Sequence, residues 1–108
     1  MRVFERGGCE GNKVCSFIRY KAKEGCEDEF LAELKAANHG NSRFLSWKIV
    51  SLGDREFIET LVYEDIENIM DTQDGGVAWL DRVEHLLELY DDGSRTIVFS
   101  GIVVEEKD

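Results

Sequence analysis

Glu59 lies inside the strand-like run EFIETLVYED and is the main candidate for chemistry in this chain. Alternation along a strand places Phe57, Glu59, Leu61 and Tyr63 on one face, so apolar neighbours flank the carboxylate. Burial raises the pKa of a carboxyl group, and a basic neighbour lowers it again. A carboxylate tuned in this way can take a proton from a phenolic substrate, and the Tyr63 hydroxyl can assist.

Two basic side chains are candidates for the neighbour of Glu59. Arg19 belongs to the strand-like run KVCSFIRYKA, and Lys48 belongs to RFLSWKIVSL. Either pairs with Glu59 if these runs are its neighbouring strands, with strands one and three at the sheet centre. Two interpretations stay open, because Glu59 is either a catalytic base or a member of a structural ion pair within a dimer.

Aromatic side chains supply the apolar part of the candidate site. Phe17, Trp47 and Tyr63 would line a pocket for a small apolar ligand, with ordinary core or subunit packing as the alternative. The sequence has no glycine-rich phosphate loop and no nucleophile elbow, and its three cysteines lack metal-ligand spacing. We therefore expect no metal site.

The elements that must position these residues follow from hydrophobic periodicity and from the glycine and acidic residues between the periodic runs. The sequence predicts an N-terminal arm over residues 1–12, a strand over 13–22, a helix over 23–38, a hairpin of strands over 43–52 and 56–63, a helical piece over 65–73 that breaks at Gly75-Gly76, a helix over 77–90, and a strand over 95–106 with a bulge at Gly101.

This β-α-β-β-α-β order predicts a single ferredoxin-like α+β domain over residues 13–108, a four-stranded antiparallel sheet with two helices on one face. Both faces of the strand over residues 56–63 are substantially apolar. Because helices cover only one face, we expect a second copy of the chain to cover the other, which gives a homodimer.

Composition limits the partners of this domain. The formal net charge is -10 and the sequence pI is about 4.6, which argues against binding to nucleic acid or to an anionic membrane. No apolar run approaches the ~20 residues needed to span a bilayer, and the first residues lack the apolar stretch of a signal peptide. We therefore expect a soluble, cytoplasmic protein.

The runs YKAKEGCEDEFLAEL and ETLVYEDIENIM, in this element order, resemble the antibiotic biosynthesis monooxygenase family of the dimeric α+β barrel superfamily, over Lys13 to Glu105. The resemblance implies cofactor-independent oxidation of a small aromatic substrate in a cavity at the dimer. Many family members carry a histidine about nine residues after the aromatic that ends strand three, where this chain has Thr72. The alternative is a non-catalytic dimeric module for ligand binding or assembly.

Mapped onto this chain, the enzyme interpretation divides the candidate residues into two roles. Glu59 and Tyr63 would be catalytic. The substrate-binding residues would be Phe17, Arg19, Trp47 and Lys48.

Overall fold

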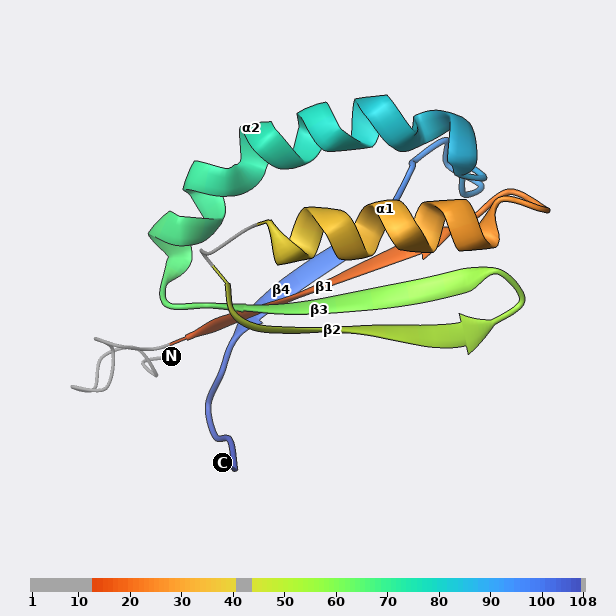
Figure 1. The fold of residues 1–108 in the computed structure, drawn as a ribbon. Helices are drawn as coiled ribbons and strands as arrows, with labels where there is room; N and C mark the ends of the chain where they lie inside the picture. The colour runs from red at the N-terminus through yellow and green to blue at the C-terminus, as the bar shows by residue number, and fades with distance from the viewer. Residues whose placement is uncertain (1–12, 41–43, 108) are drawn as a thin grey trace.

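The fold is built on a four-stranded antiparallel sheet (Figure 1). The computed structural model describes residues 13–40 and 44–107, and within residues 66–74 it describes the backbone alone. The strands stand in the order β2-β3-β1-β4, so β1 and β3 form the central pair, as the sequence predicts. Their bounds are Val14–Lys21 for β1, Phe44–Gly53 for β2, Glu56–Tyr63 for β3 and Ile97–Ile102 for β4.

Two helices, α1 (Glu27–His39) and α2 (Ile66–Val83), lie on the same face of the sheet (Figure 1). Three acidic residues occupy the first turn of α1, where the helix dipole favours negative charge. Phe30, Leu34 and Asn38 are its buried residues, and their spacing of four puts them on one stripe that faces the sheet. The predicted ferredoxin-like α+β architecture is confirmed. The predicted arm over residues 1–12 lies outside the described residues.

The second helix differs from the prediction at its centre. It continues through Gly75 and Gly76, where the sequence predicted a break. A glycine inside a helix costs only about 1 kcal/mol relative to alanine, and the chain contains no proline that would remove a backbone donor. In the part of the chain that the structure describes, no helix has the length and apolar character needed to cross a membrane.

The predicted helix to residue 90 is also wrong at its end. The chain leaves α2 after Val83, makes one 3-10 turn over Glu84–Leu86 and becomes extended at Leu87. The Lys23 N–H donates to the Leu86 carbonyl at 2.8 Å, and Leu87 forms a bridge with Ala22 beyond the end of β1. This path buries Leu86 and Leu87. A helix continued through these residues would have to pack differently to bury both.

The hairpin between β2 and β3 has the predicted position. Asp54 and Arg55 have φ of 54° and 67°, which makes a two-residue turn with positive φ at both central positions. Such turns match the right-handed twist of paired strands. The bulge predicted at Gly101 is absent from β4, because Gly101 pairs in register with Cys15. The described irregularities lie in β2 instead.

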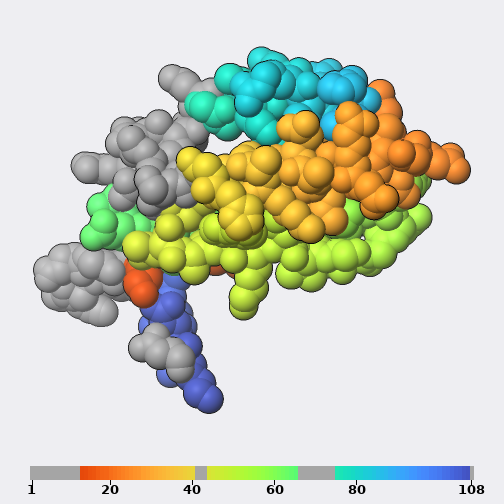
Figure 2. Space-filling view, viewed as in Figure 1, coloured from red at the N-terminus to blue at the C-terminus, as the bar shows by residue number. Residues whose placement is uncertain are grey.

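The two faces of the sheet have different environments. The helix-covered face holds the core, with rings of Tyr20, Phe30 and Phe57 packed against leucines from the 3-10 turn and the segment after it. The opposite face, called the open face below, carries Phe17 stacked on Phe99 at 5.0 Å. Phe99 is 53% exposed, so this apolar face is uncovered in a single copy of the chain. Residues after β4 extend beyond the sheet as an arm (Figure 2).

Candidate functional site

Glu59 is a buried carboxylate at the centre of the sheet. Its side chain lies on the helix-covered face of β3, where it is 3% exposed. Ile18 on β1 and Ile49 on β2 stand opposite it in the ladder, so apolar side chains flank it on both sides. The Tyr20 hydroxyl, diagonal to Glu59 across the β1–β3 pair, donates a hydrogen bond to its Oε1 at 2.8 Å.

The basic partners expected for Glu59 are on the other face. Ile18 and Ile49 are the residues that pair with Glu59 on the neighbouring strands. Arg19 and Lys48 are each one residue away from these positions, so their side chains point to the opposite face of the sheet. Arg19 binds Glu56 instead, with 2.8 Å between Nη2 and Oε2. Glu59 therefore makes no ion pair with Arg19 or Lys48 of the same chain.

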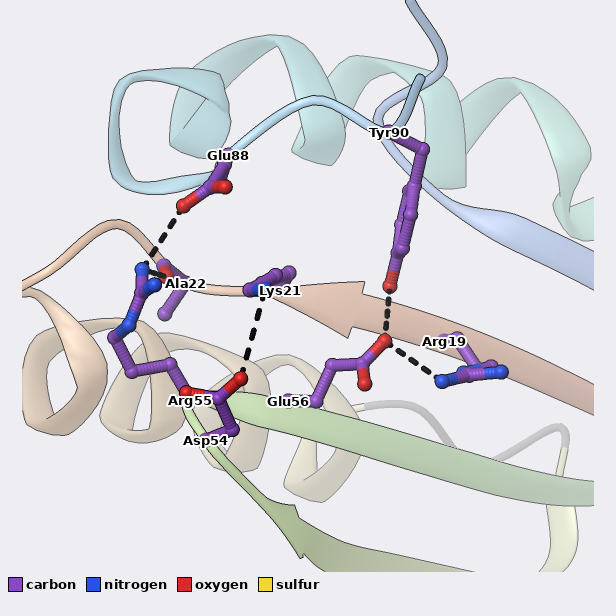
Figure 3. A network of polar contacts seen from close by, with 8 residues as sticks. All are labelled: Arg19, Lys21, Ala22, Asp54, Arg55, Glu56, Glu88 and Tyr90. Carbon is purple, nitrogen blue, oxygen red and sulfur yellow. Dashed lines mark hydrogen bonds and ion pairs between the residues drawn. The ribbon is translucent and has the colours of Figure 1, made fainter. Parts of the chain in front are cut away.

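The open-face network around Arg19 is a separate polar site (Figure 3). The Tyr90 hydroxyl donates to Glu56 Oε2 at 3.1 Å, so this one oxygen accepts from both Tyr90 and Arg19. Burial and the Glu56 carboxylate raise the pKa of Tyr90 to about 12. Arg19 Nε is also buried and makes no hydrogen bond within the described residues.

The aromatic candidates divide between the two faces. Trp47 stands opposite Leu61 on the helix-covered face, half-buried and edge-on to His39 at 5.1 Å. Tyr63 is 6% exposed and meets Phe44 edge-on at 5.2 Å. The structure thus places the six candidates in two sets, with Glu59, Tyr63 and Trp47 under the helices and Phe17, Arg19 and Lys48 on the open face.

The electrostatics of Glu59 follow from its burial. Burial raises the pKa of its carboxyl group, while the hydrogen bond from Tyr20 and the nearby Asn38 amide oppose that rise. The pKa of Tyr20 is raised well above 10.0 by burial and by the Glu59 charge, with a smaller effect of Tyr63. Tyr20 therefore stays a neutral donor while Glu59 is a stronger base than a surface glutamate.

Two residues of this site were missed by the sequence interpretation. Tyr20 was treated only as part of a strand, although its alternation from Ile18 places it on the same face as Glu59. Asn38 was treated only as the last residue of the predicted helix over 23–38. Its spacing from Phe30 and Leu34 gives it a place on the buried stripe of α1, and it is 5% exposed.

Aromatic rings pack around Tyr20, the hydrogen-bond partner of Glu59. The Tyr20 ring lies 5.1 Å from Phe30 and 6.1 Å from Trp79, both measured between ring centroids. Phe30 in turn contacts Trp79 at 6.1 Å. The site therefore combines one basic carboxylate and one neutral donor with apolar flat surfaces, a combination suited to an aromatic ligand that carries a polar group.

A hollow of about 500 Å³ lies on the surface near the end of α2. Its acidic residues are exposed, and Arg95 bridges Asp81 and Glu84 at 2.6 and 3.0 Å. His85, which belongs to this hollow, is exposed among these acids. No group of metal-binding side chains occurs among the described residues. The hollow is lined by Lys23, Asp81, Glu84, His85, Leu87, Glu88 and Leu89.

The comparison with known proteins supports the fold alone. No family model and no curated protein matches the sequence. A solved structure of a protein of unknown function from Nitrosomonas europaea matches with a TM-score of 0.73 and 19% identity, over 91% of this chain and 95% of that one.

Two further solved structures carry the name "putative antibiotic biosynthesis monooxygenase". The protein from Chloroflexus aurantiacus has a TM-score of 0.70 and 13% identity, over 89% of this chain and 97% of that one. The protein from Deinococcus radiodurans has a TM-score of 0.68 and 14% identity, over 88% and 96%. The resemblance noted in the sequence is thus confirmed as a shared fold.

Proposed function

We propose that this protein is a cofactor-independent oxygenase that binds a small aromatic phenol beside Glu59, under the helices of a single subunit. The observation that carries the proposal is the Tyr20–Glu59 hydrogen bond of 2.8 Å in a site 3% exposed. A buried carboxylate with a raised pKa is the base that phenol deprotonation requires. This location replaces the cavity between sheet and partner that the sequence predicted.

The chemistry needs no group beyond the substrate and dioxygen. Glu59 takes the phenolic proton, and Tyr20 remains hydrogen-bonded to the carboxyl group. The phenolate then reacts with dioxygen, so that one oxygen atom enters the ring and the other leaves in water. A phenol and dioxygen give a quinone and water with atoms and electrons in balance.

Tyr63 and Trp47 act on the ring of the substrate in this proposal. Tyr63 is four residues from Glu59 along β3, and a strand rises about 3.3 Å per residue, so the two backbone positions are about 13 Å apart. Tyr63 and Glu59 are therefore better placed to contact opposite ends of one ligand than to contact the same oxygen atom.

The open face has a different role, which is contact with a second copy of the chain. Phe17 stacks on the exposed Phe99 on this face, and Val50, on the same face of the other edge strand β2, is 42% exposed. The Arg19 side chain, 38% exposed on this face, adds a charged group to the proposed contact. Phe17, Arg19 and Lys48 thus belong to the proposed homodimer contact, away from the substrate.

A non-catalytic ligand-binding module is the second candidate, because Glu59 already has a hydrogen-bond partner in Tyr20. Oxygen consumption with α-naphthol separates the two candidates. The wild-type protein should consume dioxygen and form naphthoquinone. Glu59→Gln should lower the rate by a factor of about 100 or more, since general-base catalysis contributes about 10²–10⁴.

Glu56→Gln is the matched control, because it removes a carboxylate from the open face of the same strand. We expect its rate to stay within a few-fold of the wild type. Binding of α-naphthol without oxygen consumption would favour the non-catalytic module. Equal rates for wild type and Glu59→Gln would contradict the role of Glu59.

A further inference from the structure

Asn38 is a buried polar residue on the helix stripe that faces the sheet. Its Nδ2 makes no hydrogen bond within the described residues, although the residue is only 5% exposed. Buried donors nearly always have an acceptor, and those that lack one call for an explanation. Here the amide stands at the last buried position of α1, on the stripe that faces the sheet.

The location of this amide connects it with Glu59. Asn38 lies close enough to the carboxylate to affect its pKa, yet the two make no hydrogen bond of acceptable geometry. The site thus presents a free donor from α1 beside an acceptor from β3. Phe30, about two helical turns before Asn38 on the same stripe, contacts the Tyr20 ring at 5.1 Å.

Few ligand groups match both. A hydroxyl group donates one hydrogen bond and also accepts, so it satisfies the carboxylate and the amide together. A carbonyl or ether oxygen only accepts, which leaves Glu59 without a donor from the ligand. An ammonium group only donates, which leaves Asn38 unpaired.

We propose that Asn38 binds the ligand's hydroxyl oxygen directly. Its Nδ2 donates a hydrogen bond to that oxygen, and Glu59 accepts the hydroxyl proton. This inference rests on the proposed function and names a further residue of the same site. When the proton moves from the oxygen to a Glu59 carboxylate oxygen, negative charge develops on the ligand oxygen. The Asn38 hydrogen bond then becomes charge-assisted and stronger, which stabilises the anion.

Calorimetric binding of α-naphthol and of its methyl ether tests this assignment. The wild-type protein should bind α-naphthol at least about tenfold more tightly than the ether, which cannot donate to Glu59. In Asn38→Leu the affinity for α-naphthol should fall by about tenfold or more. Leucine has a similar volume and removes an unpaired donor, so the melting temperature of the variant should equal or exceed that of the wild type.

The results that overturn the inference are distinct from those that overturn the proposed function. If Asn38→Leu keeps the wild-type affinity for α-naphthol while Glu59→Gln loses the preference for α-naphthol over the ether, Asn38 has no role and the function stands. If the wild type binds neither compound, or both equally, both proposals fail. A lower melting temperature with unchanged naphthol affinity would make Asn38 structural. Asn38→Ala, a smaller replacement, serves as the second variant and should show the same loss of affinity for α-naphthol.

Discussion

The hydrogen bond between Tyr20 and Glu59 gives the most specific stability prediction. Tyr20→Phe removes the hydroxyl that donates to Oε1 at 2.8 Å and keeps the ring against Phe30 and Trp79. The variant therefore creates no sizeable cavity, and its effect isolates the polar contact. Both residues are buried, and the variant removes the Tyr20 donor from the Glu59 carboxylate.

The size of the effect depends on the charge of Glu59. A hydrogen bond to a charged group contributes about 1.5–3 kcal/mol, and one between neutral groups contributes about 1 kcal/mol. We expect Tyr20→Phe to lower the free energy of unfolding by about 2 kcal/mol near pH 8, where more of Glu59 is ionised, and by about 1 kcal/mol near pH 4. The removed bond opposes the rise in the Glu59 pKa, so its loss matters more as the pH increases.

Urea unfolding at fixed protein concentration measures both values. With a slope of about 2 kcal/mol/M, the midpoint should shift by roughly 1 M near pH 8. Fixed concentration matters because self-association adds to the apparent stability. Tyr90→Phe is the matched control, since Tyr90 also donates to a glutamate, at 3.1 Å, in a more exposed site. A loss below about 0.5 kcal/mol near pH 8, or a loss larger at pH 4, would refute this reasoning.

Three other predictions follow from the same structure. Burial raises the folded-state pKa of Glu59 above 4.5, so the stability contributed by its neutral form is fully present below pH 4.5 and is lost as the pH rises through the folded-state pKa. Glu59→Gln should therefore match the wild type near pH 4 and unfold at a higher urea concentration than the wild type near pH 8. Phe99→Asp should yield monomers in sedimentation velocity, whereas Leu89→Asp, at a residue equally exposed but off the open face, should leave the dimer intact. Gly53→Ala should destabilise by about 1 kcal/mol in urea unfolding, because Gly53 has φ of 86°.

The strand that carries the site was predictable because its alternation is regular. The bounds of β3 and the shared face of Phe57, Glu59, Leu61 and Tyr63 agree with the sequence. The environment of that face was not predictable, since both faces of the strand are apolar and either could have met the helices. The sequence therefore placed Glu59 on a face without showing whether helices or a second copy covered it.

The errors have local physical causes. A shift of one residue along a strand moves a side chain to the opposite face, so choosing Arg19 over Tyr20 exchanged a basic partner for a neutral one. Asparagine is typical of helix ends, so the residue type of Asn38 did not indicate that it lies on the buried stripe of α1. The end of α2 depended on backbone pairing between Leu87 and Ala22, which no local pattern encodes.

The most direct test of the central claim is a carbon-13 NMR titration of the Glu59 carboxyl group, assigned through Glu59→Gln, with and without α-naphthol. We predict a midpoint above the ordinary 4.5 in the free protein and a shift of the Glu59 resonance when α-naphthol binds. The resonance of Glu56, on the open face, should not respond to α-naphthol. A Glu59 midpoint at or below 4.5, or a resonance unaffected by bound α-naphthol, would contradict the proposed site.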